Sequence, residues 1–181
     1  SVYPQAATVT EKIFREEETV NLLNSGMEWL GQSLNTGNNV SYNHPLPGLD
    51  VSQPIKYIFH LGAQASYVSS FSVYEHGNLL GSKSFSALRL GDYDLQLDQQ
   101  DLTKIVTPAF TDGQSSLSFN YVSNGPSGTG FIDWYELYYE RRLTANNDVF
   151  AFSTPTSSGT LEYKINGFSS GQTAVYDVSK F

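Results

Sequence analysis

The stretch from Gly130 to Leu143, GFIDWYELYYERRL, decides the fold of this chain, because it predicts a single long β-strand. It contains no proline and no internal glycine, and it is dense in aromatic and branched side chains that favour strands. Alternation places Phe131, Tyr135, Leu137 and Tyr139 on one face and Ile132, Trp134, Glu136 and Tyr138 on the other. Because both faces are largely apolar or aromatic, we expect a central strand that is covered on both sides.

Shorter alternating or apolar segments predict further strands on either side of this one. They cover residues 55–61, 67–75, 79–85, 116–122, 149–152, 161–165 and 174–178. His76-Gly77-Asn78 predicts a hairpin turn between the second and the third of them. About eight strands at this spacing, with no repeat period, predict an all-β fold. We expect an antiparallel β-sandwich that is jelly-roll-like (galactose-binding-like).

Three segments carry weaker patterns. Residues 17–24 predict a helical turn or two, ended by Asn24-Ser25-Gly26. Residues 35–54 are rich in Gly, Asn and Pro and predict a loop. Residues 95–106 fit either a strand or a short helix that begins at Leu102 with Asp101 as its cap.

Length and composition predict one domain over residues 1–181, with a loop-rich N-terminal part over residues 1–54. A hydrophobic content of 39%, with 14% aromatic residues, is enough for a packed core. Thr144–Asp148 is a weak candidate for an internal boundary. No signal peptide is visible at Ser1, so we expect a processed protein or a piece of a longer one.

Charge and cysteine content exclude several classes of function. The net charge of −8, without any Lys/Arg cluster, argues against nucleic acid or an anionic membrane as partner. The chain has no cysteine, so it has no disulfide, no zinc–thiolate site and no thiol nucleophile. No apolar run approaches the roughly 20 residues of a membrane span.

The histidines and serines offer no recognisable catalytic or metal motif. His44, His60 and His76 lack HxH or HxxxH spacing, so we expect packed or surface histidines. Ser127 lies in GPSGTG, which lacks the strand–turn–helix context of an exposed nucleophile and the lysine of a phosphate-binding loop. We therefore predict no catalytic residue and no metal-binding residue.

Carboxylates are the next candidates. Asp133 and Glu136 lie three residues apart on the predicted strand, so they point to opposite faces unless a bulge intervenes. We expect Glu136 to form a structural ion pair, with Arg141, Arg142 or a backbone donor as its partner. Other carboxylates would allow a calcium ion between loops, with solvated loop charge as the default: Glu16, Glu17, Glu18, Asp92, Asp94, Asp98 and Asp101. No other cofactor is expected.

Exposed aromatic rings are candidate platforms for sugar rings. Trp29, after the turn at Ser25-Gly26, is the best single residue for this role, whereas we expect Trp134 in the core. The candidate binding residues are therefore Trp29, the neighbouring Glu28, and Glu136.

The long strand also carries a family resemblance. GFIDWYELYYERRL resembles the LDYIELNY-type strand just ahead of the catalytic domain in gingipain-family cysteine peptidases of type IX secretion, the PorU-like sortases. Residues 14–34 are similar to that family's acidic segment followed by an SG-x-x-W-x-G-E motif, with Gln32 in place of the final glutamate. Residues 71–84 resemble its strand pair with a glycine turn. The tail AVYDVSKF, residues 174–181, is similar to the VWDVTNP phrase at which the family's chain enters the catalytic domain.

This resemblance implies a function for the chain as part of a larger protein. Full-length relatives are surface or outer-membrane-associated peptidases that recognise exported cargo by its C-terminal signal domain. They remove the signal and attach the cargo to cell-surface lipopolysaccharide. The family's catalytic His and Cys would lie after Phe181, and residues 146–181 would be terminal strands leading to that domain. The resemblance thus implies an exported, non-catalytic domain that packs against a downstream peptidase domain, with exported cargo or outer-membrane proteins as further partners.

Two alternatives stay open. A free-standing carbohydrate-binding module would also use a β-sandwich, with Trp29 as its sugar platform. An enzyme in its own right, such as a glycosidase built on Asp133 and Glu136, is the third option, but the two carboxylates are not expected to converge.

Overall fold

The computed structural model of this chain describes residues 3–22, 29–89, 97–153 and 159–178. Within these residues there are eleven strands and no helix. The strands are β1 (Gln5–Ala6), β2 (Thr8–Glu16), β3 (Gln32–Asn35), β4 (Asn39–Pro45), β5 (Ile55–Gln64), β6 (Ser69–Glu75), β7 (Asn78–Phe85), β8 (Asp98–Val106), β9 (Gln114–Ser123), β10 (Thr129–Arg142) and β11 (Glu162–Tyr163). No helix in the described residues is long and apolar enough to cross a membrane.

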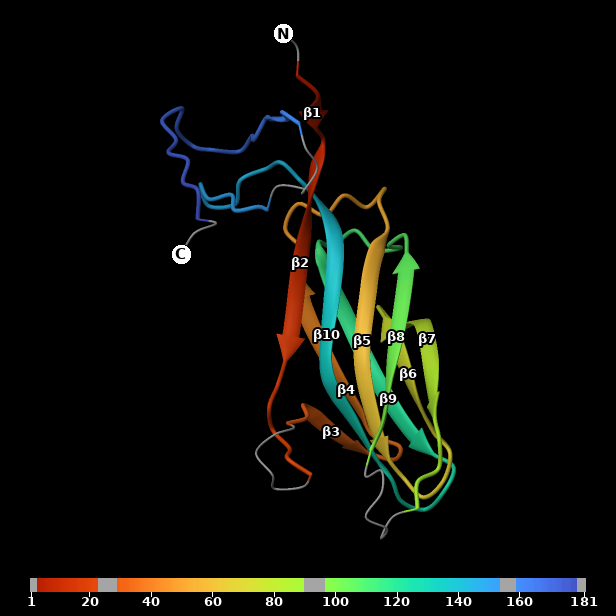
Figure 1. The fold of residues 1–181 in the computed structure, drawn as a ribbon. Helices are drawn as coiled ribbons and strands as arrows, with labels where there is room; N and C mark the ends of the chain where they lie inside the picture. The colour runs from red at the N-terminus through yellow and green to blue at the C-terminus, as the bar shows by residue number, and fades with distance from the viewer. Residues whose placement is uncertain (1–2, 23–28, 90–96, 154–158, 179–181) are drawn as a thin grey trace.

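Two antiparallel sheets stack face to face (Figure 1). The five-stranded sheet has the order β2-β10-β5-β8, and β3 pairs with the first residues of β10, beyond the end of β2. The four-stranded sheet has the order β4-β9-β6-β7. The predicted all-β, antiparallel, jelly-roll-like sandwich is therefore confirmed.

Aromatic side chains from both sheets meet in the middle of the sandwich. Phe59 of β5, Phe119 of β9 and Tyr135 of β10 are almost completely buried, and their ring centroids lie 5.5–6.1 Å apart. Such inward-facing positions alternate with outward-facing ones along each strand. The inner face of each sheet therefore forms one shared core, and the outer faces are left for other contacts.

Strand β10 is central, as predicted, but from Trp134 onward only one of its faces is buried. Tyr135, Leu137 and Tyr139 point into the core, whereas the outward side chains from Trp134 on are partly exposed. At the start of the strand the consecutive residues Phe131 and Ile132 are both buried. The register with β5 shifts between Ile132 and Trp134, which marks a β-bulge at Asp133. From Trp134 onward the expectation of cover on both faces was wrong, because the outward aromatic rings pack on each other and no further layer covers them among the described residues.

The segments with weak sequence patterns differ most from expectation. Residues 35–54 contain strand β4, so the loop prediction was wrong there. Residues 98–106 form strand β8 paired with β5, and Asp101 caps no helix. Residues 17–22 form no helix, since Val20 bridges to Leu30, and residues 23 and 24 lie outside the described part. Cross-strand pairing outweighed the local composition in each case.

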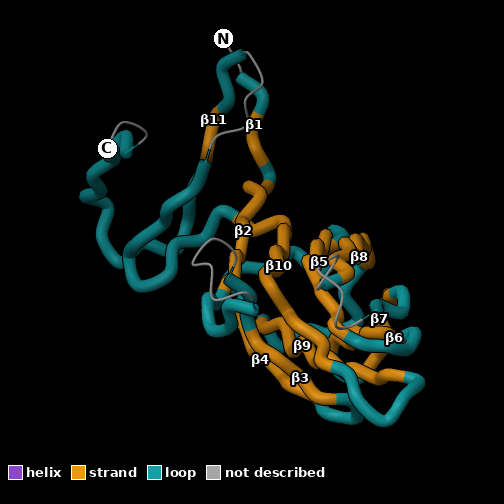
Figure 2. The backbone as a smooth tube through the Cα atoms, turned by 60° about the horizontal axis from the view of Figure 1, so that its bottom comes forward, coloured by secondary structure: helices purple, strands orange, loops and turns teal. Residues whose placement is uncertain are grey.

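After Leu143 the chain leaves the sandwich as an extended arm, which Figure 2 shows on one side of the strands. Among the described residues of the arm, only Glu162–Tyr163 form a strand, paired in parallel with β1, so the strands predicted over 149–152 and 174–178 were wrong. Phe152 packs between Phe150 and Tyr163, and Arg141 of β10 lies 4.4 Å from the Phe150 ring. The last described residues are exposed, with Val175 at 95%.

Candidate functional site

An aromatic surface lies on the outer face of the five-stranded sheet. We call it the Trp134 face, and it consists of Lys12, Phe14, His60, Trp134, Glu136 and Tyr138. Trp134 lies parallel to the His60 ring with centroids 5.2 Å apart, and the Phe14 ring lies 6.4 Å from Trp134. Phe14 is 50% exposed. Trp134 is therefore on this surface, and its predicted place in the core was wrong.

Glu136 lies at the centre of the Trp134 face and is held by two donors. Lys12 Nζ lies 2.5 Å from one carboxylate oxygen, and the Tyr138 hydroxyl donates to the other at 2.5 Å. The hydrogen bond from Lys12, then that from Tyr138, keeps the pKa of Glu136 below its usual range. The predicted ion pair exists with Lys12 as its partner, because Arg141 pairs with Glu11 instead. A carboxylate that stays ionised in this way is a poor general acid.

The bulge in β10 brings Asp133 towards His60. Asp101 Oδ1 lies 2.5 Å from His60 Nδ1, and Asp133 Oδ2 lies 3.9 Å from His60 Nε2. Two carboxylates and the Trp134 ring thus fix the orientation of the imidazole. His60 is a packed surface histidine, as predicted from its alternation with Ile58.

The other predicted oxygen ligands for calcium do not converge in the described residues. Asp98 accepts a hydrogen bond from the backbone amide of Ser86, and Asp101 faces His60. Asp92 and Asp94 lie outside the described residues. Among the residues that the structure describes, no group of three or more His, Asp and Glu could hold a metal ion. Calcium binding stays a prediction.

Trp29 is 45% exposed and belongs to the segment between β2 and β3, next to the bridge of Val20 with Leu30. Its neighbour Glu28 lies outside the described residues. Trp29 and Glu136 belong to different segments of the chain. A binding role for Trp29, Glu28 or Glu136 stays a prediction.

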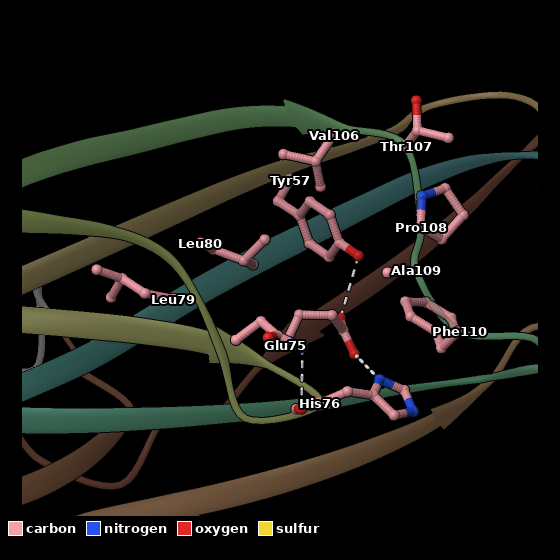
Figure 3. A pocket seen from close by; sticks show the side chains of 11 residues that line it. Tyr57, Glu75, His76, Leu79, Leu80, Val106, Thr107, Pro108, Ala109 and Phe110 are labelled. Atoms are coloured by element: carbon pink, nitrogen blue, oxygen red, sulfur yellow. Dashed lines mark hydrogen bonds and ion pairs between the residues drawn. The ribbon is translucent and has the colours of Figure 1, made fainter.

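A pocket opens at one end of the sandwich, next to the β6–β7 turn (Figure 3). Glu75 is its buried acid, with 5% of its surface exposed. One carboxylate oxygen accepts hydrogen bonds from Tyr57 Oη at 3.1 Å and Ser115 Oγ at 2.6 Å. The other accepts from the Ser116 amide at 2.6 Å and lies 2.7 Å from His76 Nδ1. Four donors satisfy the carboxylate, so Glu75 ties β6 to β5 and β9.

His76 closes this network at the surface. It has a positive φ of 48° and precedes Gly77 with φ 75°, as a two-residue hairpin turn requires, so the predicted hairpin is confirmed. The ring stacks on Phe110 at 4.2 Å, and Nε2 lies 3.2 Å from Asp112. The pocket beneath has a volume of about 190 Å³ and is lined mainly by apolar side chains. Drug-sized ligands occupy roughly 300–1,000 Å³, so this pocket suits one apolar side chain.

The His76 network predicts a pH-dependent stability. Burial lowers the pKa of His76, but the hydrogen bonds to Asp112 and Glu75 outweigh burial and raise it above the usual value. A raised pKa contributes stability that is complete below about pH 6.5 and lost as the pH rises through the folded-state pKa. We expect the free energy of unfolding, measured by urea denaturation, to fall over that range in the wild type.

His76→Asn should remove this fall, since asparagine tolerates the positive φ of the turn. His44 titrates in both proteins: burial lowers its pKa, and its ring bonds to the Tyr135 hydroxyl at 2.8 Å. The difference between the two proteins therefore isolates His76. Parallel curves for the two proteins from pH 5.5 to 8.5 would contradict the assignment.

Sequence reasoning missed Glu75 entirely, although a signal was present. In the predicted strand over residues 67–75, Glu75 is in phase with Phe71 and Val73, which are core positions. A carboxylate in phase with core residues has to be buried with partners. The alternation that predicted the strand therefore also marked its buried acid.

Comparison with known proteins adds a likeness in fold. No protein family and no curated protein matches the sequence. The fold is similar to part of dimeric latent PorU from Porphyromonas gingivalis, with a TM-score of 0.71 and 19% identity. The match covers 88% of this chain and 15% of that one, so the chain spans a small part of the longer protein. The likeness shows that the two share a fold.

Two carbohydrate-binding modules align more distantly. One is the CBM36-1 domain of a multidomain xylanase from the hindgut metagenome of Trinervitermes trinervoides, with a TM-score of 0.47 and 11% identity over 70% of this chain and 96% of the module. The other is a CBM36 module in complex with calcium and xylotriose, with a TM-score of 0.43 and 15% identity over 75% of this chain and 92% of the module. At these scores no binding site transfers to this chain.

Proposed function

We propose that this chain is a non-catalytic β-sandwich domain of a type IX secretion sortase or a related gingipain-like cysteine peptidase. The observation that carries the proposal is the fold likeness to part of PorU over 88% of the chain. The sequence motifs of that resemblance support it, because they lie on β10, on the β6–β7 pair and on the segment from β2 to β3. With no cysteine, the chain cannot supply the thiolate of such a peptidase.

The proposed role is structural: the domain packs against the peptidase domain that follows it in the longer protein. Two surfaces support this role. The Trp134 face exposes half of Phe14, and the arm exposes Val175, Tyr176 and Val178 at 95%, 81% and 67%. Apolar side chains gathered at such levels of exposure are typical of surfaces that another domain covers. Exported cargo and outer-membrane proteins are further proposed partners, in keeping with an exported protein at the cell surface.

Hydrogen exchange of two proteins tests this proposal: the isolated 181-residue chain and the longer protein encoded by its gene. In the longer protein, amides around Phe14 and residues 174–178 should exchange more slowly, because the peptidase domain covers them. Amides of the β6–β7 turn serve as the internal control. A gene without a His–Cys peptidase region after Phe181, or unchanged exchange at both surfaces, would contradict the proposal. Cleavage of a peptide substrate by the isolated chain would contradict the non-catalytic role.

Val175→Asp gives a matched mutational test. In the isolated chain its effect on the free energy of unfolding should stay within about 0.5 kcal/mol, because Val175 is already in water. In the longer protein the same change buries a carboxylate at the domain interface and should cost about 2 kcal/mol or more. Urea denaturation measures both, and Thr173→Asp in the same exposed arm is the control. Equal effects in the two proteins would show that the arm has no partner.

A carbohydrate-binding module is the second candidate, favoured by the 45% exposure of Trp29. It predicts that Trp29→Ala abolishes glycan binding while the fold stays intact. Calorimetric titration of the isolated chain with a broad glycan panel distinguishes this candidate, and flat titrations would remove it.

A further inference from the structure

The outer face of the four-stranded sheet is built mainly from small, uncharged polar side chains, with Tyr74 and Val122 as the exceptions. We call it the serine–asparagine face. It consists of Asn39, Ser41 and Asn43 of β4; Ser116, Ser118, Asn120 and Val122 of β9; Ser70, Ser72 and Tyr74 of β6; and Ser82 and Ser84 of β7. These positions alternate with core residues such as Val73 and Phe119. The face is therefore a direct consequence of the strand alternation.

The strand registers align these side chains into rows across the sheet. Asn39 is opposite Asn120, Asn120 is opposite Ser72, and Ser72 is opposite Ser82, so one row crosses all four strands. The next row runs from Ser41 through Ser118 to Tyr74, and Tyr74 is opposite Leu79 of β7, which is 59% exposed. Residues opposite each other on one face are close neighbours. The result is an array of hydroxyl and amide groups with one aromatic ring at its edge.

The other sheet shows how unusual this composition is within the same protein. Outward positions of the five-stranded sheet carry charges at Lys12, Glu16, Lys56, Asp101 and Glu136. The serine–asparagine face carries none among its twelve residues, although 15% of the chain is charged. A solvated face ordinarily mixes charges of both signs, because they favour solubility. This face is thus unsuited to an anionic or a cationic ligand.

A hollow of about 360 Å³ lies on this face, over β4, β9 and the end of β6. It is lined by five outward residues, Asn39, Ser41, Tyr74, Ser118 and Asn120, together with Gly77 and Phe119. Within the described part of the chain, no hydrogen bond joins the side chains of these five residues to other residues. Their amide and hydroxyl groups, which both donate and accept, are therefore available to a ligand.

We propose that the serine–asparagine face binds a neutral polysaccharide, with the Tyr74 ring stacked on one sugar and the asparagine and serine groups bonded to sugar hydroxyls. A neutral polysaccharide has many hydroxyl groups that can bond to the side chains of this face. Its sugar rings also have apolar faces that can stack on an aromatic ring. A protein partner fits less well, since protein interfaces are depleted in serine and have apolar centres. This inference is independent of the peptidase-associated role.

Calorimetric titration of the full 181-residue chain tests the proposal. The probes are neutral hexasaccharides of β-1,4-glucose, β-1,3-glucose, β-1,4-xylose and β-1,4-mannose, with hyaluronan and polygalacturonate fragments as anionic comparators. We expect millimolar or tighter binding to at least one neutral probe and none to the anionic ones. Tyr74→Ala should weaken that binding about tenfold or more, whereas Tyr74→Phe keeps the ring and should retain it.

Three further variants make the result decisive. Ser41→Phe places a large ring in the hollow from an exposed strand position, so it should abolish binding. This variant keeps the proposal testable if Tyr74→Ala does not fold. Tyr176→Ala, at an 81% exposed tyrosine of the arm, is the matched control and should bind like the wild type. Trp29→Ala should also bind normally. Loss of binding in Trp29→Ala alone, preference for the anionic probes, or flat titrations with every neutral probe at millimolar concentration would each overturn the proposal.

Discussion

Glu75→Ala is expected to lower the free energy of unfolding by about 4 kcal/mol, because it leaves buried donors without their acceptor. The Tyr57 hydroxyl and the Ser115 hydroxyl both donate to Glu75 from side chains with no exposed surface. The Ser116 amide loses its carboxylate partner as well. Burial, and then the charge of Glu75, raise the pKa of Tyr57, so this hydroxyl remains a donor at every working pH. Urea denaturation at pH 6 measures the loss.

Asp112→Asn is the control for Glu75→Ala, since it alters only the exposed end of the same network. We expect the control to lose only a small part of the stability that Glu75→Ala loses, because the contact between His76 and Asp112 is exposed to solvent. Glu75→Gln should fall between the two, because its amide keeps one acceptor oxygen in place. If Glu75→Ala costs less than about 1 kcal/mol, water enters the 190 Å³ pocket and replaces the carboxylate, and the network does not tie the two sheets together.

Gly31→Ala should be similarly damaging, at about 3 kcal/mol, for a steric reason. A Cβ at position 31 would lie 2.2 Å from the carbonyl oxygen of Ile132 and 2.8 Å from that of Asp133. It would also lie 3.1 Å from the carbonyl oxygen of Glu17. All three are backbone atoms, and two of them lie at the bulge of the central strand, so no side chain can rotate away. For a chain of this size the loss corresponds to roughly 10 °C in melting temperature.

Gly171→Ala is the matched control, because nothing lies within 4 Å of the added methyl group. Its melting temperature should equal that of the wild type. Hydrogen exchange adds a local readout: in Gly31→Ala, amides of residues 129–134 should exchange faster than those of β6 and β9. A Gly31→Ala variant as stable as the wild type would mean that the segment before β3 does not pack on the bulge.

Gly31 also gives a physical meaning to one motif of the family resemblance. In SG-x-x-W-x-G-E the second glycine corresponds to Gly31, and the close approach to β10 requires a residue without a side chain there. The sequence could show the glycine and its spacing from Trp29. It could not show the contact, because the bulge at Asp133 depends on how β10 pairs with β5.

The strands that sequence analysis predicted well are those whose own residues favour strands. Strands β5, β6, β7, β9 and β10 alternate clearly or are rich in β-branched and aromatic residues. Strands β2 and β4 were missed and β8 was left open, because these are edge strands with largely polar outward residues. Each pairs on one side only within its sheet: β2 with β10, β4 with β9 and β8 with β5. Their structure comes from a partner distant in the sequence, which local composition does not record.

The same contrast between local sequence signals and long-range pairing applies to the candidate surfaces. Alternation correctly placed Trp134 and Tyr138 on the face of Glu136, but it was wrong for Ile132, which lies in the core because the bulge shifts the alternation. It also did not show that Lys12 of β2 would be the partner of Glu136. The pairing of β2 with β10 is a long-range contact across the whole chain, so spacing along the sequence could not supply it. The polar alternation of the serine–asparagine face, by contrast, is visible in the sequences NVSYN and SSLSFN once those segments are known to be strands.

The bridge between Val20 and Leu30 holds together the two ends of the segment between them, so the sheet does not depend on the length of that segment. The Val20 amide donates to the Leu30 carbonyl at 2.9 Å, and the Leu30 amide donates back at 2.7 Å. The chain between these two residues is thus closed at its base, before β3 begins. Doubling the length of a closed loop costs only about 0.6 kcal/mol. Residues inserted between Val20 and Leu30 should therefore cost little stability and leave the pairing of the two sheets unchanged.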